Sequence, residues 1–575
     1  MRFLFILLLL IQPPCLGTEE LIPTKEFSLH DLPTILDALF ERHNGKGRID
    51  EKRAIESNAH FFELFDPHKV YLLQREVSPF LQESDGKRFA QRIKNHSFST
   101  YFEMLEICQK AIRRSQNIQR EGKEPPHFEN YATDDKELHD RISLLSKDAA
   151  SHEDLWLSLS PTGETAPKLA RFILKSIVAT FDAHSKVMDK AQARALRERL
   201  TKEGVGTGIT AKKTNGSWQI ERITKGSPAE KMGIVQVNDT LLSINHIDCS
   251  SMSQEGIDSF LHSDEEKSVH ITIERNNTSL STSVPSKPYT ISEGRVSVQH
   301  RSTPQGSIAL ITIPSLYRGS NVSTEKDIEE GLIKAKRPLS GMLIDLRDNK
   351  GGYISEAARV VGLFVSTGVV ASAVYKNKTQ HIFRDQDPKR IYTGPIIVLI
   401  SHTTASSAEI VAQALADYGK AIIVGDPRSY GKGSVQMQTV TRSSSEALPM
   451  KMTVGRIHTV SGYCFQGKGV LSDIAISDHA PPPRDKPVQE YDDIEPRFND
   501  LLEDISKEDL SWYKRQYLPY LQAPTEQYRS LLPQLQRERT RRSKRPSSLY
   551  FQTEDEDHLL EEAVLILQDL IRLSK

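Results

Sequence analysis

The chain has 575 residues, and its 75 basic and 76 acidic side chains give a formal net charge of −1. A single hydrophobic core rarely serves a chain of this length, so three or four domains are expected. The balanced charge provides no general attraction to nucleic acid or to an anionic membrane, and neither is an expected partner.

The N-terminal residues are typical of a secretory signal peptide. Arg2 supplies a positive charge, residues 3–11 form an apolar run, and two prolines then precede the small residue Gly17. The run is too short to span a bilayer, so residues 1–17 are predicted to be removed after export. Cys15 leaves a lipoprotein as the alternative. No later apolar run reaches about 18 residues, so stable membrane insertion is not expected.

Residues 24–195 are predicted to form a helical N-terminal domain. Apolar residues recur there at helical spacing, as in 32–40 and 102–112. Two phrases in this region are similar, 65–70 (FDPHKV) and 181–186 (FDAHSK), but they define no regular repeat.

Three cysteines lie beyond the predicted signal peptide, at Cys108, Cys249 and Cys464. They are far apart and form no C-x-x-C pair, so no metal site is predicted. An odd number leaves at least one thiol unpaired or paired with another molecule. Buried structural cysteines are the simpler interpretation.

The rest of the chain changes character twice. From 196 to 290, short β-type runs alternate with turns, which predicts a β domain. Residues 291–485 combine strands with helices, and the apolar runs 342–346 and 396–400 predict strands buried on both faces of an α/β layer. Residues 486–575 are predicted to be polar and helical. The expected fold class is therefore multidomain α+β.

The C-terminal region contains a basic run at 537–545, an acidic patch at 554–557 and an amphipathic pattern at 559–571. A solvated loop or helix face is the simpler interpretation of the basic run. A scaffold that uses this run to bind a membrane is a remote alternative.

Two strings, 226–233 (GSPAEKMG) and 237–245 (VNDTLLSIN), resemble the core signature of PDZ domains, which implies a PDZ-like fold for residues 196–290. A glycine-rich loop precedes them. Its glycines let successive N–H groups converge on a terminal carboxylate, and the peptide then adds as a strand beside the following β-run. A plain tight turn explains this loop equally well when it is taken alone. The predicted peptide contacts are Gly204, Val205, Gly206, Thr207, Gly208 and Ile209.

Three short stretches carry candidate chemistry: 345–352 (DLRDNKGG), 404–410 (TASSAEI) and 425–436 (GDPRSYGKGSVQ). Each begins at the end of an apolar run or shortly after one. A helical pattern follows Ser406, which is therefore expected at or beside a helix N-terminus. Unpaired N–H groups there can stabilise a developing oxyanion.

A serine hydroxyl needs a base, and Lys432 lies between two glycines that permit a close approach. A lysine desolvated among buried strands has a lowered pKa and can accept a proton, as in known Ser–Lys pairs. A second oxyanion donor can come from Gly351 or Gly352. Taken separately, Ser406 is more simply a helix cap and Lys432 an exposed turn residue. A phosphate-binding P-loop is not predicted, because its G-x-x-x-x-G-K-[ST] frame is missing.

Taken together, the three stretches resemble the tail-specific, or C-terminal-processing, proteases. The motifs of that family are D-L-R-x-N-x-G-G, [ST]-A-S-x-x-E-I and G-x-P-x-(F/Y)-G-K-G-x-V-Q. The resemblance extends to 182–185 (DAHS) and 466–474 (QGKGVLSDI) and covers most of the chain beyond the signal peptide. It implies a crotonase/Clp-protease-like catalytic core at residues 291–485, between the PDZ-like domain and a helical C-terminal region.

The resemblance implies Ser406 as the nucleophile, Lys432 as the general base and Gln436 as the residue that orients the lysine. The implied oxyanion donors are the backbone N–H groups of Ser407 and Gly352. Members of the family cleave unfolded or tail-exposed proteins in the periplasm or a comparable compartment, and they need no metal or organic cofactor. An adaptor protein is a further candidate partner.

Several residues depart from the family pattern. Lys350 stands where a glycine is common, and the turn containing Arg428 and Ser429 is one residue longer than usual. Ser472 and Ala183 each replace a proline. None of these changes removes a catalytic side chain. No catalytic role is assigned to the histidines near the motifs, His184 and His402.

Two other functions compete with this prediction. A trypsin-like protease would need a G-[DN]-S-G-G motif, and the chain contains none. The second alternative is a non-catalytic scaffold that docks peptides on an inactive protease fold. The presence of Ser406, Lys432 and Gln436 argues against it.

Overall fold

The computed structural model describes most of the chain. The described residues are 27–45, 48–121, 125–145, 149–214, 216–263, 265–334, 338–365, 368–385, 387, 389–439, 448–477, 528–543 and 557–575. The predicted signal peptide, residues 1–17, lies outside them, as do residues 478–527. In these described ranges, no helix is both long and apolar enough to cross a bilayer. The chain divides into two compact units, of residues 1–193 with 437–452 and of residues 194–436 with 453–575.

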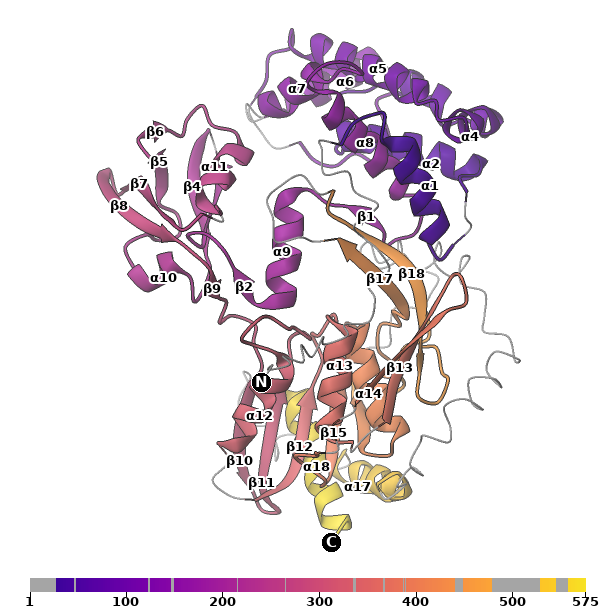
Figure 1. The fold of residues 1–575 in the computed structure, drawn as a ribbon, viewed down its shortest axis with the longest axis vertical. Coiled ribbons are helices and arrows are strands. Elements are labelled where there is room, and N and C mark those ends of the chain that lie inside the picture. The colour runs from indigo at the N-terminus through magenta and orange to yellow at the C-terminus, as the bar shows by residue number, and fades with distance from the viewer. Residues whose placement is uncertain are drawn as a thin grey trace, which may run out of the picture. The chain divides into compact units, whose positions relative to one another are not determined.

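Helices make up most of the first unit (Figure 1). Its helical elements are α1 (Leu32–Arg42), α2 (Glu51–Phe65), α3 (Gln74–Val77), η1 (Ser78–Phe80), η2 (Glu83–Asp85), α4 (Gly86–Lys94), α5 (Ser99–Ser115), α6 (Asp135–Ser143), α7 (Ala149–Ser158) and α8 (Ala166–Val178). Aromatic residues fill its core: Phe61 packs edge-on against Tyr101 and Trp156, with ring centroids 5.4 and 5.5 Å apart. The expected helical N-terminal domain is confirmed. A short strand, β1 (Lys186–Val187), pairs with the start of β18 (Met450–Thr459).

The two similar phrases of the first unit form similar turns. Asp66, just after α2, accepts hydrogen bonds from the N–H groups of residues 70–72. Asp182 accepts from the N–H groups of residues 184–185 and lies 2.6 Å from Nε2 of His43. Burial raises the pKa of Asp66 to about 6. Burial also acts to raise the pKa of Asp182, but its hydrogen bond with His43 and its other bonds outweigh burial and lower that pKa.

Helix α9 (Lys190–Thr201) leads into a β domain within the second unit. The strands of this domain are β2 (Glu203–Gly204), β3 (Ile209–Thr214), β4 (Ser217–Ile223), β5 (Thr240–Ile244), β6 (Ile247–Asp248), β7 (Lys267–Arg275), β8 (Thr278–Ser286) and β9 (Tyr289–Thr290). The antiparallel sheet has the order β3-β4-β5-β7-β8, with β6 on β5, and β2 pairs separately with β9. Two helices belong to it, α10 (Pro228–Met232) and α11 (Gln254–Leu261). Cys249 is buried in its core.

An α/β layer completes the second unit. Its main sheet contains β10 (Ser297–Thr303), β11 (Gly306–Thr312), β12 (Leu339–Asp345), β15 (Ile396–Ile400), β16 (Ala421–Gly425) and β19 (Ile474–Ala475), in the order β10-β11-β12-β15-β16-β19. All neighbours are parallel except β10 and β11. A second sheet contains β13 (Gly368–Tyr375), β14 (Gln380–Asp385), β17 (Ser434–Thr439) and β18. The three helices between the strands are α12 (Thr324–Ile333), α13 (Ile354–Gly362) and α14 (Ser407–Asp417).

Helices cover both faces of the main sheet. Met342 and Ile344 of β12 belong to the core that includes α13 and α14, whereas Leu343 belongs to the core that includes α18 (His558–Leu573). A side chain at Gly341 would collide with Ile571 of α18, so the glycine permits close packing. The prediction of strands buried on both faces is confirmed.

The basic run forms part of α17 (Leu532–Ser543), which packs beside α18. Arg542 of α17 forms ion pairs with Asp569 and Glu562 of α18. In the opposite direction, Arg572 of α18 lies 3.3 Å from Glu538 of α17. The expectation of a merely solvated face was therefore incomplete. The described part of the basic run, residues 537–543, has some of its positive charge neutralised by acidic residues of the neighbouring helix.

Candidate active site

The three predicted stretches follow three neighbouring strands, β12, β15 and β16. These strands are parallel, so their carboxyl ends lie at the same edge of the sheet. The loop after β12 carries Gly351 and Gly352, the loop after β15 carries Ser406, and the loop after β16 carries Lys432. The topology therefore brings the predicted nucleophile, base and oxyanion loop to one edge.

Ser406 occupies a sharp turn between β15 and α14. It is the N-cap residue of α14, with φ 61° and ψ −125°. A non-glycine residue with positive φ is strained, and such strain is typical of nucleophiles on strand-to-helix turns. Gly351 lies against it: a Cβ atom at Gly351 would come within 2.8 Å of the Ser406 Cβ. Only glycine fits beside the serine in this arrangement.

Glu409 joins the loop of the serine to the loop of the lysine. Its Oε2 accepts the N–H groups of Ser406 at 2.7 Å and Lys432 at 2.8 Å. Its Oε1 accepts the N–H of Gly431 at 2.7 Å and the hydroxyl of Ser429 at 2.5 Å. The side chain is completely buried, and burial raises its pKa to about 7 against these four hydrogen bonds. Sequence reasoning assigned no role to Glu409, although an acid on the buried face of a helix is an available signal.

The glycines beside Lys432 permit close backbone contacts. Gly431 has φ 94°, and a Cβ atom there would lie 2.9 Å from the Gly469 nitrogen. Gly433 donates its N–H to Oε1 of Gln466 at 2.7 Å. The segment after β18 therefore holds the lysine loop. The longer turn does not disturb the loop, because its residue Ser429 is one of the donors to Glu409.

Gln436 lies in β17, which begins two residues after Lys432. Its amide Nε2 is buried and has no hydrogen-bond partner among the described residues. An unpartnered buried donor is uncommon in proteins and marks a group that can bind substrate or water. The role of Gln436 in orienting the lysine stays a prediction.

The predicted oxyanion donors lie at the start of α14 and in the loop after β12. Ser407 is the first residue of α14, so the helix does not use its N–H. Gly351 donates its N–H to Oδ1 of Asn349 at 2.8 Å. The bridge between Gly352 and Leu316 uses the Gly351 carbonyl and the N–H of residue 353, and it leaves the Gly352 N–H aside. Of the two glycines, Gly351 therefore has an N–H that is already bonded within the loop, and the oxyanion role of Gly352 stays a prediction.

Asn349 ties the oxyanion loop to its surroundings, and sequence reasoning missed it. Its amide Nδ2 donates to the Ile313 carbonyl at 2.9 Å, and its own carbonyl accepts the Ala405 N–H at 2.9 Å. The side chain is completely buried. Asn349 therefore fixes both Gly351 and the residue that precedes Ser406.

The predicted carboxylate loop, residues 204–209, leads from β2 into β3, the outer strand of the PDZ-like sheet. Gly206 donates its N–H to the Lys287 carbonyl at 3.3 Å, and Thr207 donates to the Leu261 carbonyl at 2.9 Å. A ligand carboxylate would have to displace these bonds or use other donors of the loop. The peptide contacts stay a prediction.

The two histidines beside the motifs each bind an aspartate. His184 donates its backbone N–H to Asp182 at 2.6 Å. His402 lies 2.8 Å, through Nδ1, from Asp426, and its backbone N–H donates to the same carboxylate at 2.7 Å.

Comparison with known families gives three matches along the chain. Residues 35–158 match the tail specific protease N-terminal domain, residues 219–275 match the PDZ domain, and residues 307–476 match peptidase family S41. Their order is the order of the predicted domains.

Individual relatives are more distant. The chain is 26% identical over 317 residues to a probable CtpA-like serine protease of Staphylococcus aureus, a match that covers 54% of this chain and 61% of that protein. Its counterpart in Staphylococcus epidermidis is 27% identical over 318 residues, which cover 55% and 62%. The match thus spans about three fifths of these relatives. Among solved structures, a photosystem II D1 C-terminal processing protease has 19% identity, coverage of 57% and 86%, and a TM-score of 0.33.

Proposed function

Because the chain belongs to peptidase family S41, we propose that it is a serine endopeptidase that cleaves unfolded or tail-exposed proteins. The observation that carries this proposal is the bond pair at Glu409. A single carboxylate oxygen accepts the backbone N–H groups of both Ser406 and Lys432, at 2.7 and 2.8 Å. The backbone nitrogens of the proposed nucleophile and base are therefore hydrogen-bonded to the same oxygen atom.

In the proposed reaction, the neutral amine of Lys432 accepts the proton of the Ser406 hydroxyl as the oxygen attacks the scissile carbonyl. The N–H groups of Ser407 and Gly352 stabilise the oxyanion. The lysine then protonates the leaving amine, and water hydrolyses the acyl-enzyme by the same proton route. Gln436 holds the amine in position. Because only the neutral amine acts as a base, activity rises with pH.

The PDZ domain supplies substrate recognition in this proposal. The apolar C-terminal tail of a substrate adds as a strand beside β3, with its carboxylate at residues 204–209. The signal-like residues 1–17 support export to the periplasm or an equivalent envelope compartment. Unfolded proteins in that compartment are the proposed substrates. An adaptor protein is a further candidate partner.

The test is cleavage of an unfolded protein with an apolar tail by the chain without residues 1–17. Ser406→Ala and Lys432→Ala are expected to abolish cleavage without loss of folding. Lys468→Ala is the matched control, because Lys468 also lies between two glycines but is exposed. Tail binding without cleavage by the wild type would instead favour the peptide-docking scaffold.

A further inference from the structure

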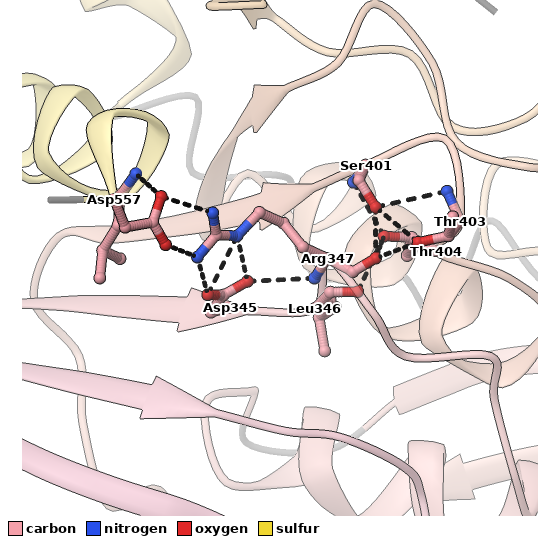
Figure 2. A network of polar contacts seen from close by, with 8 residues as sticks. Asp345, Leu346, Arg347, Ser401, Thr403, Thr404 and Asp557 are labelled. Carbon is pink, nitrogen blue, oxygen red and sulfur yellow. Dashed lines mark hydrogen bonds and ion pairs between the residues drawn. The ribbon is translucent and has the colours of Figure 1, made fainter. Parts of the chain in front are cut away.

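Arg347, in the loop after β12, joins two carboxylates from distant parts of the chain (Figure 2). Its Nε and terminal nitrogen donate to Asp345 at 3.0 and 2.7 Å. The other edge of the guanidinium contacts Asp557 through both terminal nitrogens, one of them 2.8 Å from Oδ1. The Arg347 side chain is only 19% exposed. Both partners are therefore engaged in the two-pronged geometry that makes Arg–carboxylate pairs strong.

The backbone of Arg347 is held by the loop that carries the nucleophile. Its carbonyl accepts the hydroxyl groups of Ser401, of Thr403 at 2.7 Å and of Thr404 at 3.4 Å. Thr404 lies two residues before Ser406. Figure 2 shows these contacts of Arg347 as dashed lines. Because residue 347 precedes the oxyanion loop and Thr404 precedes Ser406, Arg347 links the two loops.

Asp557 comes from the far end of the sequence. It is the N-cap of α18 and accepts the Leu560 N–H at 3.1 Å. Its helix is anchored on the main sheet by buried residues such as Leu567 and Ile571. The main chain of Asp557 is therefore placed by a packed helix, and its carboxylate, which is 43% exposed, binds Arg347 from that position.

We propose that Asp557 is a positioning residue for the reaction at Ser406: by holding the Arg347 guanidinium, it fixes the oxyanion loop against the nucleophile loop. This inference rests on the proposed peptidase function. Small displacements of reacting groups are costly, since a shift of about 1 Å can reduce a rate by roughly 100-fold. The C-terminal helix thereby contributes to catalysis without touching the substrate.

The test compares kcat and KM of the wild type and Asp557→Ser. Serine keeps a good helix cap but is too short to reach Arg347. We expect kcat to fall about tenfold or more with KM unchanged, because substrate binding does not involve this contact. Asp557→Asn keeps the cap and one acceptor oxygen, so its kcat should lie between those of the wild type and Asp557→Ser. It replaces Asp557→Ser as the test if that variant does not fold.

Glu561→Gln is the matched control. It removes another ion pair of the same helix, formed at 2.6 and 2.8 Å with Arg301 of β10, the edge strand of the main sheet. Its kcat should equal that of the wild type. A kcat of both Asp557 variants within about twofold of the wild type would overturn the proposal.

Hydrogen exchange separates this inference from the proposed function. Asp557→Ser should accelerate exchange in residues 346–352 and 401–406, whereas Glu561→Gln should not. If the wild-type chain cleaves nothing, the proposed peptidase function is contradicted. The exchange rates of the two loops then test separately whether Asp557 positions them. Unchanged exchange in both loops would count against it.

Discussion

Glu409 accepts four hydrogen bonds from two loops while its side chain is completely buried. Protonation would place a hydrogen on an oxygen that already faces N–H or O–H donors. The ionised form is therefore the one that orders Ser406 and Lys432. Burial makes that form costly, which is why the pKa rises to about 7 from 4.5.

The stability of the second unit should depend on this group. Because the folded pKa lies above the unfolded value of 4.5, the contribution of Glu409 to stability is complete below pH 4.5 and is lost as the pH rises through about 7. The loss is on the order of 3 kcal/mol, at about 1.4 kcal/mol for each pKa unit. Urea unfolding across this pH range should show the decline in the wild type and a flatter profile in Glu409→Gln. Parallel profiles would contradict the assignment.

Gly351 offers a second test at the residue scale. Gly351→Ala places a Cβ atom 2.8 Å from the Ser406 Cβ at a φ of 88°, so kcat should fall about 100-fold or more. Gly216→Ala is the control, because Gly216 has a similar φ of 84° and no atom within 4 Å. That variant should lose only about 1 kcal/mol of stability and keep its activity. Steady-state kinetics of both proteins distinguish steric damage at the site from backbone strain alone.

The secondary-structure elements could be predicted from the sequence where their side chains are mostly buried. The run Ile396–Ile400 forms β15 with the predicted bounds, because a strand covered on both faces is apolar at every position. The roles of Glu409 and Asn349 were not predicted, because both residues act through hydrogen bonds to other loops, and the sequence does not show which loops lie beside them. The pairing of the basic run with α18 went unpredicted for the same reason.

Within the helical unit, the contact between His43 and Asp182 should be a major source of stability. The two side chains are 3% and 0% exposed, so His43→Ala removes one hydrogen-bond partner of a buried carboxylate and should cost about 3 kcal/mol in urea unfolding. His60→Ala removes an exposed contact with Glu63 and should cost less than about 1 kcal/mol. Equal losses in the two variants would contradict this account.

At the scale of the whole molecule, the family matches place a PDZ domain ahead of the peptidase core. If the loop at residues 204–209 binds a terminal carboxylate, a peptide with an amidated C-terminus should bind at least about tenfold more weakly than the free acid, since charged hydrogen bonds are lost. Calorimetric titration with both peptides measures the difference. Equal affinities would remove this loop from the mechanism.

The order of the domains was predictable, because each carries a sequence signature of its own. Their arrangement was not, since it depends on long-range contacts such as that of Asp557 with Arg347, 210 residues apart. The C-terminal helix therefore belongs to the peptidase core in space, although an interval of many residues separates it from the motifs.

The central claim is that Lys432 activates Ser406. The most direct measurement is the rate at which a serine-acylating reagent modifies the chain, followed by intact mass and peptide mapping across pH. We expect a single adduct on Ser406, a rate that rises with pH, and loss of the reaction in Lys432→Ala but not in Lys468→Ala. Modification of Ser406 at the same rate in Lys432→Ala would contradict it.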